Sequence, residues 1–308
     1  MNLKRTIKSI LTAAALLMAF HSCGVLSDGE LARIENLALK ADTVASVPSV
    51  IFGTMAEIRL ERGLFYAASF STPQARFDEV NALAKTSIED KKRSAKADTY
   101  IGILNSYFKA LRSIADKERW EGAGRELRGL GRAVDSLIIE HNELFGTEIP
   151  EGISKTAGKT FGYLTEHINK LRQTRYVKEF VGIGDTLVAE CTDSLMAILK
   201  SKSLNELIEN ETAGLEANYK AYLYAVSAAG YPPQIGHDRE YVALTEKVTT
   251  VKQIRNRAVS ALRAVKNAHH KLYEDLSEED LDQNVYDEFV SLNRLALEIG
   301  KQIKTLEK

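Results

Sequence analysis

The chain has 308 residues, of which 44% are hydrophobic and 27% are charged, with 41 basic and 42 acidic side chains. This length and apolar content can bury a sizeable core and exclude an intrinsically disordered chain. The balanced charge argues against a nucleic-acid partner, because nucleic-acid-binding proteins carry a strong basic excess, and the two cysteines cannot build a disulfide framework.

The N-terminal segment has the pattern of an export signal. Lys4, Arg5 and Lys8 precede an apolar run over residues 10–20. A helix of that length spans only about 16 Å, whereas the hydrocarbon core of a bilayer is roughly 30 Å thick. The pattern therefore predicts a signal peptide rather than a transmembrane helix.

The residues Phe20-His21-Ser22-Cys23 resemble the signal of bacterial lipoproteins, in which the cysteine is acylated (with palmitate, for example) and becomes the first mature residue. Ser22 fits the small residue that the family has before the cysteine, whereas Phe20 and His21 depart from its usual leucine and small residue. The resemblance covers only the N-terminal segment and implies lipidation of Cys23. An unmodified thiol at Cys23 is the alternative.

The resemblance also implies where the protein is located. The signal peptide covers residues 1–22, and residues 23–30 form a lipidated tether. In the lipoprotein family an aspartate after the cysteine tends to retain the protein in the inner membrane, and this chain has Gly24 there. The expected location is therefore the cell outer membrane of a bacterium, on either its periplasmic or its surface face.

From residue 31 onward, apolar residues recur every three or four positions, which places them on one face of a helix. No comparable stretch alternates with period two, so strands are not expected. The sequence predicts an all-α protein, an elongated bundle of about eight antiparallel helices, some over 25 residues long. The expected helices cover residues 29–45, 49–69, 73–94, 97–118, 121–146, 153–200, 203–230 and 238–307, with an interruption at Gly182-Ile183-Gly184 and a break near 275–278.

Capping residues define the expected helix ends. Thr72, Ser203 and Ser277 each have a hydroxyl that can accept a hydrogen bond from the first turn of a helix. Gly230 can adopt the left-handed conformation that ends a helix, and the prolines at 232 and 233 cannot continue it. These signals agree with the helices that the apolar spacing predicts.

The helical region at 31–308 contains two possible sub-boundaries, near 147–152 and 230–237, where prolines occur. One continuous bundle and two sub-bundles are both compatible with this pattern. The sequence shows no internal repeat with a fixed period.

The sequence contains no recognisable catalytic or metal-binding motif. Residues 152–160 end in Gly-Lys-Thr, but Ile153 stands where a phosphate-binding loop needs glycine. No Gly-x-Ser-x-Gly and no Glu-x-x-His occurs. The adjacent His269 and His270 lie about 100° apart on a helix and are expected on different faces. Cys191 lies on an apolar stripe and is expected to pack as a small hydrophobic residue. No catalytic residue, metal site or cofactor is therefore predicted.

The densest aromatic cluster consists of Tyr219, Tyr222, Tyr224 and Tyr231. Tyrosine is enriched in binding hot spots, so these four residues are the candidate partner-binding residues. Tyr219 and Tyr222 also lie on an apolar stripe, which favours packing in the core for this pair. Tyr224 and Tyr231 are then the pair expected to be exposed.

The leading functional interpretation is a lipid-anchored envelope protein that serves as a non-enzymatic helical binding or structural module. Its expected partner is a protein or a polymer, and the membrane is contacted through the lipid anchor. The alternatives are a small-ligand receptor with a pocket between helices and an enzyme whose site is assembled from residues far apart in the sequence.

Overall fold

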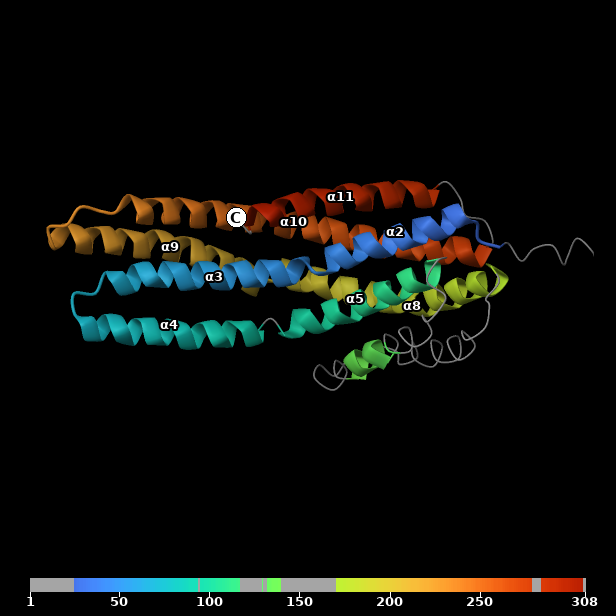
Figure 1. Ribbon diagram of the computed structural model, residues 1–308, viewed down its shortest axis with the longest axis horizontal. Helices are drawn as coiled ribbons and strands as arrows, with labels where there is room; N and C mark the ends of the chain where they lie inside the picture. The colour runs from blue at the N-terminus through green and yellow to red at the C-terminus, as the bar shows by residue number, and fades with distance from the viewer. Residues whose placement is uncertain are drawn as a thin grey trace, which may run out of the picture.

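Figure 1 shows the protein, in a computed structural model, as an elongated bundle of long helices. The structure describes residues 25–93, 95–116, 129, 132–139, 170–278 and 284–306. All regular secondary structure in these ranges is helical, and no strand occurs there. This confirms the prediction of an all-α fold.

The named helices are α2 (Asp28–Ala45), α3 (Val47–Ala68), α4 (Pro73–Arg93), α5 (Ala95–Ala115), α8 (Lys170–Lys200), α9 (Lys202–Ala228), α10 (Ile235–Glu278) and α11 (Asn284–Leu306). In Figure 1, α3 continues the line of α2, α5 that of α4, and α9 that of α8. These three lines and the long helices α10 and α11 alternate in direction along the bundle. Neighbouring lines along the chain are therefore antiparallel, as the sequence predicts. The two helices within one line run in the same direction.

Local sequence explains the breaks within the lines. Pro48 lies in the first turn of α3, where its missing N–H costs no hydrogen bond. Ser201 is extended, and its hydroxyl accepts a hydrogen bond from the Leu204 amide at 3.2 Å. Ser201 is therefore the cap of α9, and the predicted cap at Ser203 is wrong by two residues, because the hydroxyl that reaches the third amide of the helix is that of Ser201.

The turns at the left end of Figure 1 follow the predicted capping rules. The Thr72 hydroxyl accepts a hydrogen bond from the Ala75 amide at 3.4 Å, at the start of α4. Gly230 has a φ of +76°, and the amide of Tyr231 donates to the carbonyl of Val226 at 3.1 Å. This is a Schellman ending of α9, which confirms the predicted role of Gly230.

One predicted break and one predicted helix start are wrong, whereas the break expected near 275–278 agrees with the separate helices α10 and α11. Residues 182–184 lie within the continuous helix α8, because a glycine in a helix costs only about 1 kcal/mol and burial of the flanking apolar residues offsets that cost. Ser277 lies inside α10, where its hydroxyl donates to the carbonyl of Tyr273 at 2.7 Å. The described part of α10 continues to Glu278, and α11 begins at Asn284.

Some predictions fall largely or wholly outside the described residues. These are most of the helix expected at 121–146, the first part of that expected at 153–200, and the possible sub-boundary at 147–152. The lipidation site Cys23 and the signal peptide at 1–22 also lie outside them.

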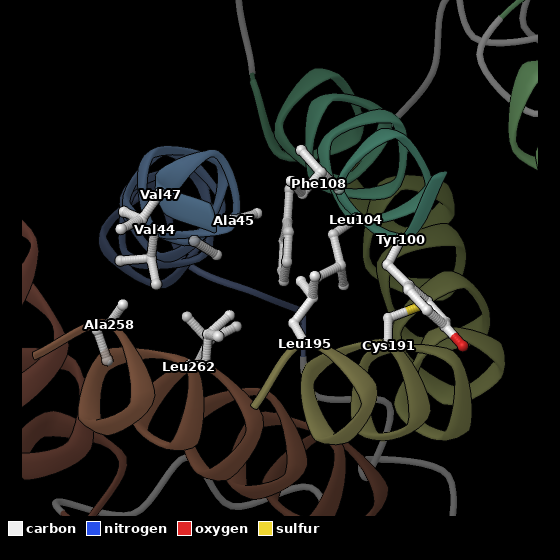
Figure 2. Close-up of a cluster of buried hydrophobic side chains, with 14 of the residues drawn as sticks. Val44, Ala45, Val47, Tyr100, Leu104, Phe108, Cys191, Leu195, Ala258 and Leu262 are labelled. Carbon is white, nitrogen blue, oxygen red and sulfur yellow. The ribbon is translucent and has the colours of Figure 1, made fainter. Parts of the chain in front are cut away.

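The core is one hydrophobic cluster that runs through the bundle. Figure 2 shows a part of it, where Val44, Phe108, Cys191 and Leu262 from different helices lie together. Cys191 is fully buried, and burial raises the pKa of its thiol, which confirms its expected role as a small hydrophobic residue. Residues before and after the predicted sub-boundary at 230–237 belong to this same cluster.

None of the described helices is both long enough and apolar enough to span a bilayer.

Candidate functional site

One polar group at the core is a cluster of four side chains from three helices. Tyr107 of α5 lies 2.7 Å from Nε2 of His269 on α10, measured from the phenol oxygen. The carboxylate of Asp185 on α8 lies 3.2 Å from Nδ1 of His269 and 2.9 Å from Nδ1 of His270. We call these four residues the histidine cluster.

Burial sets the protonation states in this cluster. Burial lowers the pKa of His269 below its ordinary value, because the charged imidazolium loses its water, although the Asp185 carboxylate acts in the opposite direction. Burial, followed by the Asp185 charge, raises the pKa of Tyr107 well above its usual range. A neutral His269 that donates from Nδ1 to Asp185 and accepts at Nε2 from the Tyr107 hydroxyl satisfies all three groups.

The pKa of Asp185 is also lowered, although burial alone would raise it. Hydrogen bonds from His269 and His270 outweigh burial and hold this pKa below the usual value. Asp185 is therefore a carboxylate at neutral pH, with each of its two oxygens bound to one histidine. The cluster connects α5, α8 and α10 through one chain of hydrogen bonds.

The order carboxylate, imidazole, hydroxyl resembles the order of a catalytic triad, but its environment does not suit catalysis. The side chains of Tyr107 and His269 are completely buried, so no substrate can reach the phenol oxygen. A nucleophile also needs a lowered pKa or a base in contact with substrate, whereas the pKa of Tyr107 is raised. Within the described residues, no three His, Cys, Asp or Glu side chains are grouped so that they could hold a metal ion.

The sequence reveals only part of this cluster. His269 is buried and His270 exposed, as expected for adjacent residues on different helix faces. Sequence reasoning missed that both rings bind one carboxylate, because Asp185 is more than 80 residues away in the chain. No local pattern marks Tyr107 or Asp185 as their partners.

The pKa of His269 predicts how stability depends on pH. Its folded pKa is below the unfolded value of 6.5, so its contribution is complete above pH 6.5 and is lost as the pH falls from 6.5 through the folded pKa. We expect the free energy of unfolding, measured with urea, to fall between pH 6.5 and 5.5 by up to about 1.4 kcal/mol per pH unit from this group. Asp185 remains ionised in this window because its pKa is lowered.

His269→Gln and His270→Gln are the matched variants for this measurement. The first should flatten the slope between pH 6.5 and 5.5 because it removes the buried imidazole, and the second should keep that contribution because His269 stays in place. Equal slopes in wild type and His269→Gln would show that His269 titrates normally in the folded protein.

The second polar and aromatic cluster lies near the turn between α9 and α10. Phe65 of α3 is in the middle, with ring centroids 5.1 Å from Tyr219 and 5.9 Å from Tyr222. The Tyr222 hydroxyl lies 2.5 Å from Nδ1 of His237. Tyr241 stacks on Tyr219 at 4.3 Å. The Tyr222 hydroxyl is therefore satisfied by His237, and the rings pack against one another.

The four candidate tyrosines divide as the sequence suggests. Tyr219 and Tyr222 are buried, and burial together with a hydrogen bond to Asp238 raises the pKa of Tyr219 to about 12. Tyr224 and Tyr231 are 77% and 71% exposed. Only this exposed pair is accessible to a partner.

Other exposed apolar side chains occur in the same hairpin and in the hairpin of α3 and α4. In the halves of the two hairpins nearer to their turns, the exposed large hydrophobic residues are Leu64, Tyr66, Phe77, Val80, Tyr224, Tyr231, Ile235 and Val242. Residues 63–75 and 221–236 contain no Asp, Glu, Lys, Arg or His. We call these two segments the distal end, because α2 begins at the opposite end of the bundle (Figure 1).

Comparison of the chain with protein families, with curated proteins and with solved structures gives no match.

Proposed function

We propose that this protein is a non-enzymatic contact module of the bacterial envelope, anchored by lipid on Cys23 and presenting its distal end to a partner. The observation that carries the proposal is the charge-free, aromatic distal end, at the opposite end of an elongated bundle from the start of α2. The sequence predicts a protein or polymer partner. The absence of charge at the distal end favours a partner surface that itself carries little charge.

The polar clusters support a structural rather than a catalytic role for the interior. The hydroxyls of Tyr107 and Tyr222 are bound to His269 and His237, and Asp185 is shared by two histidines. Groups that are fully engaged with one another connect helices and leave little capacity for substrate. The exposed tyrosines, by contrast, combine apolar area with a polar tip, which suits binding.

The length of the bundle suits a module that holds its binding surface away from its anchor. The single helix α10 has 44 residues, which corresponds to about 66 Å. Its N-terminal part borders the distal end, and its C-terminal part lies near the start of α2 (Figure 1). An anchor just before α2 and a partner at the distal end would therefore be separated by most of this length.

Fractionation of cells that express Cys23→Ser tests the anchor. We expect the variant to lose its acyl chains and its share in washed membranes to fall, because none of the described helices is long and apolar enough to span a bilayer in place of the anchor. The readout is the share of protein in washed membranes, with incorporation of labelled palmitate as an independent measure. Unchanged membrane association together with unchanged labelling would show that Cys23 is not the anchor.

A photoactivatable residue in place of Tyr231 tests the contact. In intact envelopes it should form a crosslinked adduct, whereas the same residue in place of Leu297, which is 52% exposed on α11, should not. If both positions give the same adducts or none, the distal end is not the contact surface.

A further inference from the structure

The imidazole of His269 is enclosed by groups from three helices. The phenol oxygen of Tyr107 on α5 lies 2.7 Å from Nε2, and the carboxylate of Asp185 on α8 lies 3.2 Å from Nδ1. On α10 itself, His270 binds the second oxygen of the same carboxylate, and the ring of Phe108 packs edge-on against His269. Among the described residues, the titratable groups that face His269 are therefore Tyr107, Asp185 and His270.

The Tyr107 hydroxyl has a second hydrogen-bond acceptor within reach. Its oxygen lies 3.5 Å from the carbonyl oxygen of Phe180 on α8, at the outer limit of a hydrogen bond. Gly184, one turn further along α8, permits this approach, because a side chain there would overlap the hydroxyl. The stacked ring of Phe180 holds the ring of Tyr107, with centroids 4.9 Å apart. The hydroxyl hydrogen can therefore turn from His269 to this carbonyl while the ring stays in place.

We propose that the histidine cluster is a proton-operated hydrogen-bond switch, in which the Tyr107 hydroxyl donates to a neutral His269 and accepts from a protonated one. In the neutral state Nδ1 carries the hydrogen, because the carboxylate of Asp185 can only accept, and Nε2 accepts from the hydroxyl. One proton taken from solvent water then binds at Nε2. The phenol oxygen accepts a hydrogen bond from the new N–H, and the hydroxyl hydrogen, still bound to its oxygen, turns to the carbonyl of Phe180.

Both states of the switch pair the buried groups. The protonated imidazole donates to Asp185 and to Tyr107, and Asp185 supplies the opposite charge because its pKa is held below the usual value. The carbonyl of Phe180 has two lone pairs, of which the helix uses one. Burial lowers the pKa of His269, so the switch operates in acid. Helices α5, α8 and α10 then remain connected in both states, independently of the anchor and of the distal end.

The effect of removing the hydroxyl distinguishes this switch from a tyrosine that only donates. A hydroxyl that only donates stabilises the neutral imidazole alone, so its removal would raise the pKa of His269. A hydroxyl that also accepts stabilises the charged imidazole more strongly, because charge-assisted hydrogen bonds are about twice as strong as neutral ones. Its removal then lowers the pKa of His269.

Tyr107→Phe is the variant that tests the direction of this change. The full chain in detergent is labelled with ¹³C-histidine and titrated by NMR, and the signal of His269 is identified by its absence in His269→Gln. We expect the proton affinity of His269 to be roughly three- to tenfold lower in Tyr107→Phe than in the wild type. Tyr222→Phe is the matched control, because it removes another buried hydroxyl that is bound to a histidine, His237, and should leave the titration of His269 unchanged.

The ring nitrogens of His269 in the wild type provide a second test that needs no substitution in the switch. With ¹⁵N-histidine, the nitrogen chemical shifts report which ring nitrogen carries a hydrogen. We expect a hydrogen on Nδ1 alone above the pKa of His269, and on both nitrogens below it. The hydrogen on Nε2 should exchange slowly with water, because the side chain of His269 is completely buried.

Urea unfolding adds a measure that does not depend on NMR. If the hydroxyl stabilises the protonated imidazole more strongly, Tyr107→Phe should lose more stability in acid than at neutral pH. A higher or unchanged proton affinity of His269 in this variant, a smaller loss of stability in acid, or a neutral His269 with its hydrogen on Nε2 would each overturn the switch.

Discussion

Replacing Gly184 with alanine is expected to lower the free energy of unfolding by about 2 kcal/mol, although alanine is the better helix former. A Cβ at this position in α8 would lie 2.1 Å from the phenol oxygen of Tyr107 and 2.2 Å from the ring carbon that bears it. Overpacking of this kind costs up to about 3 kcal/mol, and the gain in helix propensity offsets about 1 kcal/mol of it.

Tyr107 cannot move aside easily. Its ring stacks on that of Phe180, with centroids 4.9 Å apart and planes 4° apart, and its hydroxyl is bound to His269. Moving the ring would break both contacts. For the same reason Tyr107→Phe should not rescue Gly184→Ala, because ring carbons at 2.2 and 2.3 Å would still overlap the new methyl group.

Gly182→Ala is the matched control on the same helix. Its Cβ would lie 3.6 Å from the ring of Tyr273, which is an ordinary contact distance. We expect this variant to be more stable than the wild type by about 0.5–1 kcal/mol. Urea unfolding of both variants provides the measurement, and a stability of Gly184→Ala equal to that of Gly182→Ala would show that Tyr107 does not lie against α8.

The two glycines also show what the sequence could and could not predict. Apolar residues at three- and four-residue spacing predicted most of the described helices, and Ile101, Leu104, Phe108 and Leu111 are all buried as expected. The pair Gly182 and Gly184 suggested a break because glycine is a poor helix former. The close approach of Tyr107 to Gly184 involves residues 77 positions apart and leaves no local trace in the sequence.

The same reasoning applies to the candidate sites. The division of the tyrosines into a buried and an exposed pair follows from helical spacing, since Tyr219 and Tyr222 lie on the apolar stripe and Tyr224 does not. The distal end as a surface could not be recognised in the same way. Its two charge-free segments are far apart in the sequence, and only the register of α3 against α9 brings them together.

That register depends on a buried carboxylate, and Glu211→Ala is expected to lower the free energy of unfolding by about 3 kcal/mol. The side chain of Glu211 on α9 is 2% exposed, and its two oxygens bind Arg59, at 2.7 Å, and Arg62. Removing the carboxylate deprives two guanidinium groups of this partner. Both arginine side chains are only 22% exposed. Breaking a fully buried ion pair costs about 3–5 kcal/mol, and the partial exposure of the arginines places the expected loss at the lower limit.

Glu216→Ala is the control on the same helix. Glu216 forms its ion pair with Lys220 in solvent, with both side chains more than half exposed, so its removal should leave the stability of the protein almost unchanged. Urea unfolding compares the two variants directly. Equal stability of both would show that the α3–α9 contact is maintained by apolar packing alone.

A triple variant separates the loss of a favourable pair from the cost of unpaired charges. Replacing Arg59, Arg62 and Glu211 together by methionine removes all three charges and keeps similar side-chain volume. Because burying charges is itself unfavourable, we expect the triple variant to be more stable than Glu211→Ala. Gly214 allows the Arg62 guanidinium to lie against α9, since a Cβ there would come within 2.6 Å of it. If the triple variant is less stable than Glu211→Ala, the attraction between the arginines and Glu211 stabilises the register of α3 and α9. The shape of the distal end then depends on this ion pair.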